Sequence, residues 1–142
     1  MKTQSFTAHR DHLLVLDPDD EFVASLTDFA KENRIEGGSF SAIGAFQQAT
    51  IAYWNRETRE YENIEVADQV EVLALSGSIA RSADDVKIHA HAVLGRRYGS
   101  TIGGHLMRGV VFPTLEIFVV DYGTRLTRRK DDKTGLWLLS AP

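Results

Sequence analysis

The sequence predicts an α+β protein, in which a mainly antiparallel, twisted sheet of six or more strands carries one principal helix. Two observations support this fold class. One stretch, between residues 17 and 38, combines helical spacing of apolar residues with start and stop signals for a helix. The rest of the chain consists of short apolar or alternating runs separated by turn residues, which is the pattern of successive strands. One helix among many sequential strands is typical of the α+β class.

The first strand is expected at residues 12–17, where the run HLLVLD ends in an aspartate. Asp17 suits the N-cap of the helix and Pro18 its first position, with acidic side chains following near the positive end of the helix dipole. Gly37 and Gly38 are expected to end the helix, because glycine is common just past a helix C-terminus. The apolar stripe that would pack on the sheet is formed by Phe22, Leu26, Phe29 and Ala30.

Strands are expected through the remainder of the chain, with a bend at Gly44 and a glycine-rich loop at 95–104. Residues 126–130 and 136–140 flank DDKTG and are expected to pair as a closing hairpin, with Trp137 in the core. The other predicted strands are 39–55, 61–67, 69–80, 86–94, 105–112 and 114–123.

Length and composition indicate one domain over residues 1–142 and an ordinary globular balance, with 43% hydrophobic and 25% charged residues. No apolar run approaches the roughly 20 residues of a membrane span, and the first residues lack the apolar core of a signal peptide. We therefore expect a cytoplasmic protein without membrane partners. The absence of cysteine excludes disulfides, so any metal must use histidine or carboxylate ligands.

The charge balance argues against strong binding to nucleic acid. The formal net charge is −4, whereas proteins that grip duplex DNA through its phosphates usually carry a basic excess. The most basic run, RLTRRKDDK at 125–133, contains two aspartates and is expected to be a solvated hairpin.

Three of the five histidines lie in one short stretch, IHAHAVLGRRYGSTIGGHL. In an extended strand His89 and His91 share a face, about 6.6 Å apart. Two imidazoles on one face can chelate an ion, and His105 can complete a three-nitrogen set with an open coordination position, as in zinc sites that perform chemistry. Gly103 and Gly104 suit a close backbone approach that would aim the third ring, or a simple turn. Ordinary strand histidines with hydrogen-bonded partners are the alternative.

Chemistry at such a site would need an acid–base group, and the candidates are Glu71 and Glu116, each a carboxylate within an apolar strand. Either could instead orient an imidazole or form an interface ion pair. Three arginines flank the histidines and would suit an anionic ligand, although solvated side chains are the simpler interpretation. They are Arg96, Arg97 and Arg108.

The chain resembles the PPC (plants and prokaryotes conserved) domain family over about residues 13–139. The segments that carry the resemblance occur in family order and are SAIGAFQQATIAYW, VEVLALSGSIA, IHAHAVLG, GSTIGGHL and TLEIFVV. It implies a mainly antiparallel sheet with a packed helix, a homotrimer, and a metal bound by His89, His91 and His105, as in stand-alone prokaryotic members. Those members are commonly labelled DNA-binding by analogy with plant forms, whose AT-hook motif is missing here.

Three functions follow as hypotheses. The first is a trimeric zinc protein with a DNA-binding or regulatory role, which the resemblance implies. The second is a metal-dependent enzyme acting on a small, anionic molecule. The third is a scaffold for another protein, in which the metal is structural.

Overall fold

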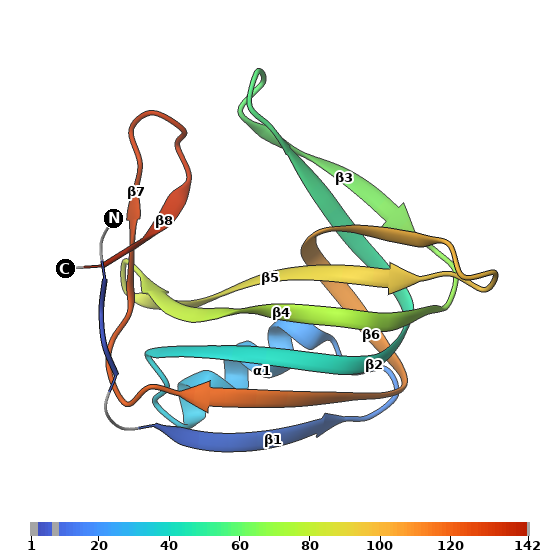
Figure 1. Ribbon diagram of the computed structural model, residues 1–142, viewed down its shortest axis with the longest axis horizontal. Coiled ribbons are helices and arrows are strands. Elements are labelled where there is room, and N and C mark those ends of the chain that lie inside the picture. Colours follow the sequence, from blue (N-terminus) through green and yellow to red (C-terminus); the bar gives the residue numbers. More distant parts are fainter. Residues whose placement is uncertain (1–2, 7–8, 142) are drawn as a thin grey trace.

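The computed structural model describes residues 3–6 and 9–141, and in them the chain forms one α-helix and eight strands (Figure 1). This sheet-dominated arrangement confirms the predicted α+β class. The elements are β1 (Arg10–Leu16), α1 (Phe22–Glu32), β2 (Gly37–Asn55), β3 (Glu60–Val66), β4 (Val70–Ser82), β5 (Asp85–Gly95), β6 (Thr101–Asp121), β7 (Thr127–Lys130) and β8 (Trp137–Ser140).

The strands pair in the order β3-β2-β6-β5-β4-β7-β8, with β1 added to β6. Because β2 also pairs with β4, the strands β2, β6, β5 and β4 form a closed circuit of hydrogen-bonded neighbours. All pairs are antiparallel except β4 with β7. The β2–β3 and β7–β8 hairpins both extend above β5 in the view of Figure 1, from opposite ends of the sheet.

The long strands bend, and Gly44 marks one bend as predicted. Its φ is +147°, and the register of β2 against β4 shifts between Ala42 and Gly44. A Cβ atom at Gly44 would lie 2.3 Å from the carbonyl oxygen of Thr114, so only glycine lets β6 pass this close. The bend allows β2 to pair with β4 along its first part and with β3 along its last.

The helix begins later than predicted, at Phe22 and not at Asp17. Residues 17–20 form a turn instead, in which Asp19 adopts a φ of 73° and its N–H donates to the carbonyl of Val111. Glu21 is the N-cap, and its carboxylate accepts hydrogen bonds from the backbone N–H groups of Val23 and Ala24. The helix-start signal at Asp17 and Pro18 is therefore not used, because the hydrogen bond to Val111 in β6 stabilises residues 17–20 as a turn.

The helix also ends earlier, with Glu32 as its last residue and Arg34 in the left-handed region at a φ of 56°. Gly37 and Gly38 are the first residues of β2, so their assignment as the helix stop was wrong. A Cβ atom at Gly38 would lie 2.6 Å from the carbonyl oxygen of Val120, which explains the glycine by a close approach of β6.

The loop expected at 95–104 is confined to residues 96–100, and the two predicted runs after it form the single strand β6. Gly103 and Gly104 lie within this strand, so their interpretation as a turn was wrong. A Cβ atom on either glycine would lie 2.8 Å from a backbone oxygen, that of Ala92 or of Ala52. The alternative, a close backbone approach, is the one confirmed.

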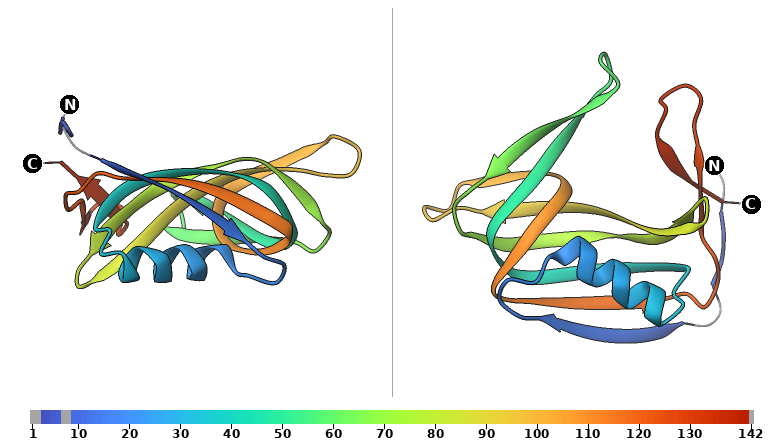
Figure 2. Two further views of the ribbon diagram at one scale, coloured as in Figure 1. Left: turned by 90° about the horizontal axis from the view of Figure 1, so that it is seen from below. Right: turned by 180° about the vertical axis from the view of Figure 1, so that it is seen from behind.

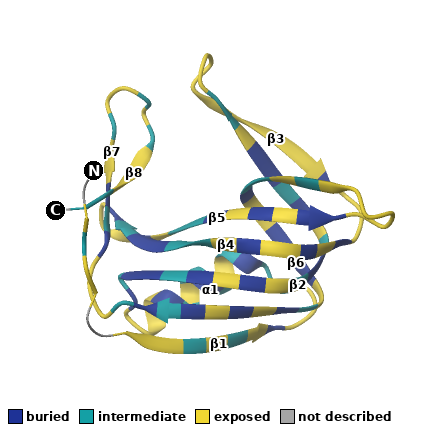
Figure 3. Ribbon diagram, in the orientation of Figure 1, coloured by how far each residue is buried: buried dark blue, intermediate teal, exposed yellow. Residues whose placement is uncertain are grey.

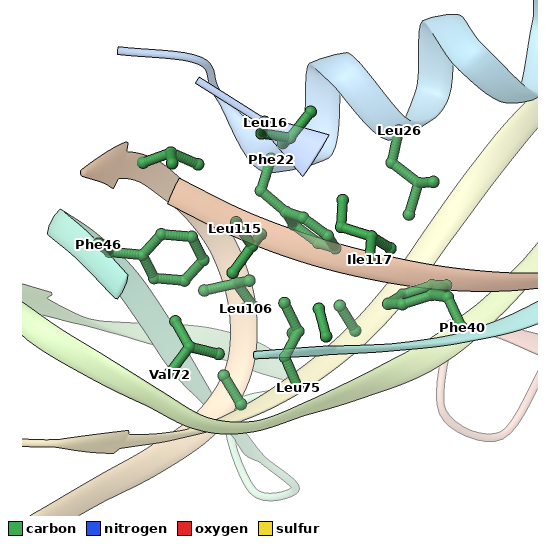
Figure 4. Packing of buried hydrophobic residues seen from close by; sticks show 14 of the residues in the cluster. Leu16, Phe22, Leu26, Phe40, Phe46, Val72, Leu75, Leu106, Leu115 and Ile117 are labelled. Carbon is green, nitrogen blue, oxygen red and sulfur yellow. The ribbon is translucent and has the colours of Figure 1, made fainter. Parts of the chain in front are cut away.

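The hydrophobic core lies between α1 and one face of the sheet (Figures 2 and 4). From α1, the buried side chains are Phe22, Leu26 and Ala30, which confirms the predicted stripe apart from half-buried Phe29. They pack with sheet residues that include Phe40, Phe46, Leu75, Leu115 and Ile117. Buried and exposed residues alternate along β4, β5 and β6, because successive side chains point to opposite faces (Figure 3).

The face of the sheet away from α1 carries an exposed apolar patch, which we call the open face. Its residues alternate with core residues on β1, β2 and β6, and Leu13 lies opposite Phe118 in the β1–β6 register. They are Leu13, Val15, Ile43 and Phe118, each 48–60% exposed.

The predicted closing hairpin forms near the C-terminus as β7 and β8. Trp137 in β8 is 45% exposed, so its predicted placement in the core was wrong. Among residues 3–6 and 9–141 no helix has the length and apolar character needed to cross a membrane.

Candidate metal centre

Three histidines from two neighbouring strands meet on one face of the sheet. His89 and His91 lie two residues apart on β5, with buried Ala90 pointing to the opposite, core side. His105 on β6 lies directly opposite His91 in the strand register. The HxH spacing and the pairing of β5 with β6 are therefore sufficient to bring the three side chains together.

The imidazole rings are mutually close. Their centroids are 5.0 Å apart for His89 and His91, 5.1 Å for His89 and His105, and 5.5 Å for His91 and His105. One ring nitrogen from each residue lies within 4.8 Å of the other two. We call these three residues the histidine cluster.

Polar and aromatic side chains from other strands surround the cluster. On β4, Ser76 and Ser78 lie opposite His91 and His89 in the register. The Tyr61 ring, from β3, lies 4.9 Å from that of His105. Arg128, from β7, donates from Nη2 to the hydroxyl oxygen of Ser78 at 2.8 Å.

Burial favours the uncharged form of two of the imidazoles. Desolvation, followed by the positive charges of Arg128 and the neighbouring histidines, lowers the pKa of His89 to about 4. Desolvation, with His91 and Arg128 as further causes, also lowers the pKa of His105. Neutral imidazole is the form that binds metal ions, so the lowered pKa values of His89 and His105 favour the form that can act as a ligand.

The cluster fits a transition-metal ion because it offers three imidazole nitrogens and because one of its buried nitrogens has no hydrogen-bond partner among the described residues. The Nδ1 atom of His105 is buried without a hydrogen-bond partner among the residues that the structure describes. Two nitrogens bound to one tetrahedral zinc lie about 3.4 Å apart, so modest side-chain rotations would close the 4.8 Å spread. Three imidazoles leave one coordination position for water or another ligand.

The two candidate carboxylates do not join the cluster. Glu71 is exposed on β4 and pairs with Gly95, about 13 Å along β5 from His91. Glu116 is exposed on the far part of β6, where it pairs with Ile43 and Val15.

The flanking arginines are also dispersed. Arg96 and Arg97 are exposed on the β5–β6 loop, where they line a hollow of about 800 Å³ with Glu71, and Arg108 is exposed on β6. None of these three acts on the pKa of His89 or of His105.

Arg128 is the residue beside the histidine cluster that the sequence did not reveal. It belongs to the basic run expected to be solvated, yet it is only 8% exposed. The parallel pairing of β7 with β4 places Arg128 opposite Ser82, and its side chain extends along β4 to Ser78. No local sequence signal marks it, because only this long-range pairing brings β7 to the histidines.

Comparison with known proteins identifies the family. Residues 3–123 match the Plants and Prokaryotes Conserved (PCC) domain. A structure of the metal-containing protein AF0104 from Archaeoglobus fulgidus is similar, with 34% identity, a TM-score of 0.91 and 99% of both chains covered. A plant- and prokaryote-conserved (PPC) protein from Pyrococcus horikoshii has 29% identity and a TM-score of 0.92, over 100% of this chain and 99% of the other.

Two other relatives widen the comparison. A candidate DNA-binding protein from Bacteroides thetaiotaomicron has 27% identity and a TM-score of 0.88, over 96% of this chain and 98% of the other. The bifunctional protein GlmU of Synechococcus sp. is 32% identical over 129 residues, which are 89% of this chain and 20% of that protein. The chain thus spans about a fifth of the curated relative that it matches. The match over residues 3–123 shows, as the motifs predicted, that the chain belongs to the plants and prokaryotes conserved domain family.

Proposed function

We propose that this chain is a metal-binding protein that holds one zinc ion through His89, His91 and His105. The observation that carries the proposal is the convergence of three ring nitrogens within 4.8 Å. The lowered pKa values of His89 and His105 favour ligation, and a relative is named a metal-containing protein. Zinc is favoured because three imidazoles suit it. With three protein ligands it could act as a Lewis acid or activate a bound water.

Elemental analysis of untagged protein tests this proposal. We expect about one zinc per chain in the wild type and none in the double variant His89→Ala/His91→Ala. The matched control is His9→Ala, which removes an exposed histidine that lies 3.7 Å from the Asp11 carboxylate, outside the cluster. A wild-type protein that is folded and takes up no metal when dialysed against zinc would contradict the proposal.

We propose a homotrimer as the assembly of this one-domain chain. Two points support it. The chain belongs to the plants and prokaryotes conserved domain family, and resemblance to that family implies a trimer. The open face also leaves apolar side chains exposed to water. Burial of such a patch against other copies would remove that apolar surface from water.

A second candidate function is a regulatory role through DNA, supported by relatives from Bacteroides thetaiotaomicron and Ralstonia eutropha that are named as candidate DNA-binding proteins. The net charge of −4 predicts few phosphate contacts. Fluorescence anisotropy with varied duplexes at low salt should therefore show weak binding with a shallow salt dependence. Absence of binding to every duplex would reject this candidate.

Metal removal separates the enzymatic and scaffold alternatives. An enzyme acting on a small anionic molecule would lose turnover on chelation and in His91→Ala, in a screen of hydrolase and lyase substrates. A scaffold would instead lose thermal stability or change its oligomeric state on chelation, and it would show no turnover with or without the metal.

A further inference from the structure

Among the residues that the structure describes, the guanidinium of Arg128 is a buried positive charge without a negative partner. The residue is 8% exposed, and none of the ion pairs among the described residues involves it. No carboxylate contributes to the pKa of Arg128, His89 or His105, whereas Arg128 itself lowers the pKa of both histidines. Its hydrogen bond to Ser78, which lies opposite His89 in the β4–β5 register, places Arg128 beside the cluster, and no carboxylate pairs with it in residues 3–6 and 9–141.

The hydrogen bonds of Arg128 leave donors unused. A guanidinium has five N–H donors. Nη2 donates to Ser78, Nη1 donates to the carbonyl of Trp137 at 3.2 Å, and Nε is buried with no partner in the described part of the chain. Both acceptors are neutral, and a buried charge is costly unless an opposite charge accompanies it.

A metal ion would increase this imbalance. The three histidine ligands are neutral, so a divalent ion and Arg128 would place three positive charges together, and in the described part of the chain no carboxylate belongs to the cluster or pairs with Arg128. The site would therefore attract an anion, and its open coordination position would be available to one. Exposed His91 lines a hollow of about 270 Å³ together with Ser76 and Gly103, so this ligand residue is open to a molecule of a few atoms.

We propose that the site binds a small oxyanion, a carboxylate or phosphoryl group, and that Arg128 is the residue that selects it. The inference rests on the proposed metal function and names its ligand class. Planar guanidinium groups pair well with both kinds of oxyanion. Arg96 and Arg97 on the β5–β6 loop and Arg108 on β6 are exposed, so water solvates their charges and they need no bound anion.

The test uses cobalt(II)-loaded protein, because the visible absorption of cobalt reports changes at its open position. Titration with acetate and with inorganic phosphate should change the spectrum saturably, and the stronger of the two identifies the source of the anionic group. In Arg128→Gln the dissociation constant should rise at least tenfold with cobalt content unchanged. In the control Arg96→Gln, on the exposed loop, it should change less than twofold. Arg128→Lys, which keeps the charge, should give an intermediate value and replaces the glutamine variant if that one does not fold.

Other outcomes reject the inference or separate it from the metal proposal. Cobalt bound at one ion per chain, with no spectral response to either anion or with equal binding by Arg128→Gln, would overturn it. A changed oligomeric mass in Arg128→Gln, without anion binding, would also overturn it, since a second copy would then supply the counter-ion. If no metal binds, the metal proposal fails. The anion site then stands only if phosphate or acetate raises the melting temperature of the wild type but not of Arg128→Gln.

Discussion

At the scale of single residues, two members of the histidine cluster, His89 and His105, are partly buried, and burial favours their uncharged form. His89 combines desolvation with a nearby guanidinium, and both disfavour its protonated form.

The lowered pKa of His89 predicts a pH dependence of stability for metal-free protein. The unfolded chain takes up the proton near pH 6.5, whereas the folded chain takes it up only at about pH 4. The unfolded state therefore binds more protons between these values, and the stabilisation present above pH 6.5 is lost as the pH falls toward 4. We expect a loss of about 1–2 kcal/mol after allowing for solvent screening of a half-exposed ring.

Urea unfolding of chelator-treated protein at pH 7 and pH 4.5 measures this change. His89→Asn, which cannot titrate, should reduce the difference between the two pH values, and part should remain because the pKa of His105 is lowered as well. An equal pH dependence in wild type and variant would show that other groups cause it.

Gly77 shows how closely β4 and β5 pack beside the cluster. A Cβ atom there would lie 2.0 Å from the carbonyl oxygen of His89 and 2.5 Å from the ring of Phe40. Gly77→Ala should therefore lower the free energy of unfolding by at least about 2 kcal/mol. Ser76→Ala, at the exposed position before it, should change stability by less than about 0.5 kcal/mol. Similar denaturation midpoints for the two variants would contradict this account.

At the scale of elements, the start of α1 is fixed by one carboxylate that also reaches across to the sheet. Besides Val23 and Ala24, Glu21 accepts a hydrogen bond from the backbone N–H of Gly109 in β6, at 3.0 Å. This side chain thus caps the helix and ties it to the strand that carries His105.

Removal of this cap should cost more than an ordinary helix cap. We expect Glu21→Ala to lower the free energy of unfolding by about 2 kcal/mol, because three backbone donors lose their acceptor. Asp28→Ala, in the exposed part of α1, is the matched control and should have an effect within about 0.5 kcal/mol. Thermal or urea denaturation measures the unfolding free energy of both variants. A loss in Glu21→Ala no larger than that in Asp28→Ala would reject the capping role.

The strands were largely predictable because alternation and turn residues are local signals, and so was the meeting of His89 with His91. The true helix start was not, since it depends on a turn at Asp19 that β6 stabilises. Gly103 and Gly104 suggested a loop because glycine looks the same in sequence whether it serves a turn or a close strand approach. Arg128 was missed because its burial depends on the pairing of β7 with β4, which joins distant parts of the chain.

At the scale of the whole molecule, α1 covers one side of the sheet and the open face is left in water (Figure 2). Clustered apolar side chains of this kind on β1, β2 and β6 are typical of an interface. They lie on strands that also contribute to the core on their other face, so an assembly through them would add a second apolar layer.

The proposed trimer gives a measurable mass. In sedimentation equilibrium the wild type should have about three times the 15.8 kDa of one chain. Leu13→Glu/Phe118→Glu places two charges on the open face and should shift the mass toward a single chain with the fold retained. Tyr98→Glu, at a 92% exposed side chain on the β5–β6 loop, is the control and should not change the mass. A wild type that sediments as one chain would reject the trimer.

The position of His91 opposite His105 has a consequence for the unfolded chain. This pair is the last in the β5–β6 register, at the point where the two strands separate. An ion shared by the two side chains would close a loop of about 15 residues, and a cross-link over such a loop is worth about 3 kcal/mol in lost chain entropy. In a protein without cysteine, the metal would then do for this hairpin what a disulfide does elsewhere.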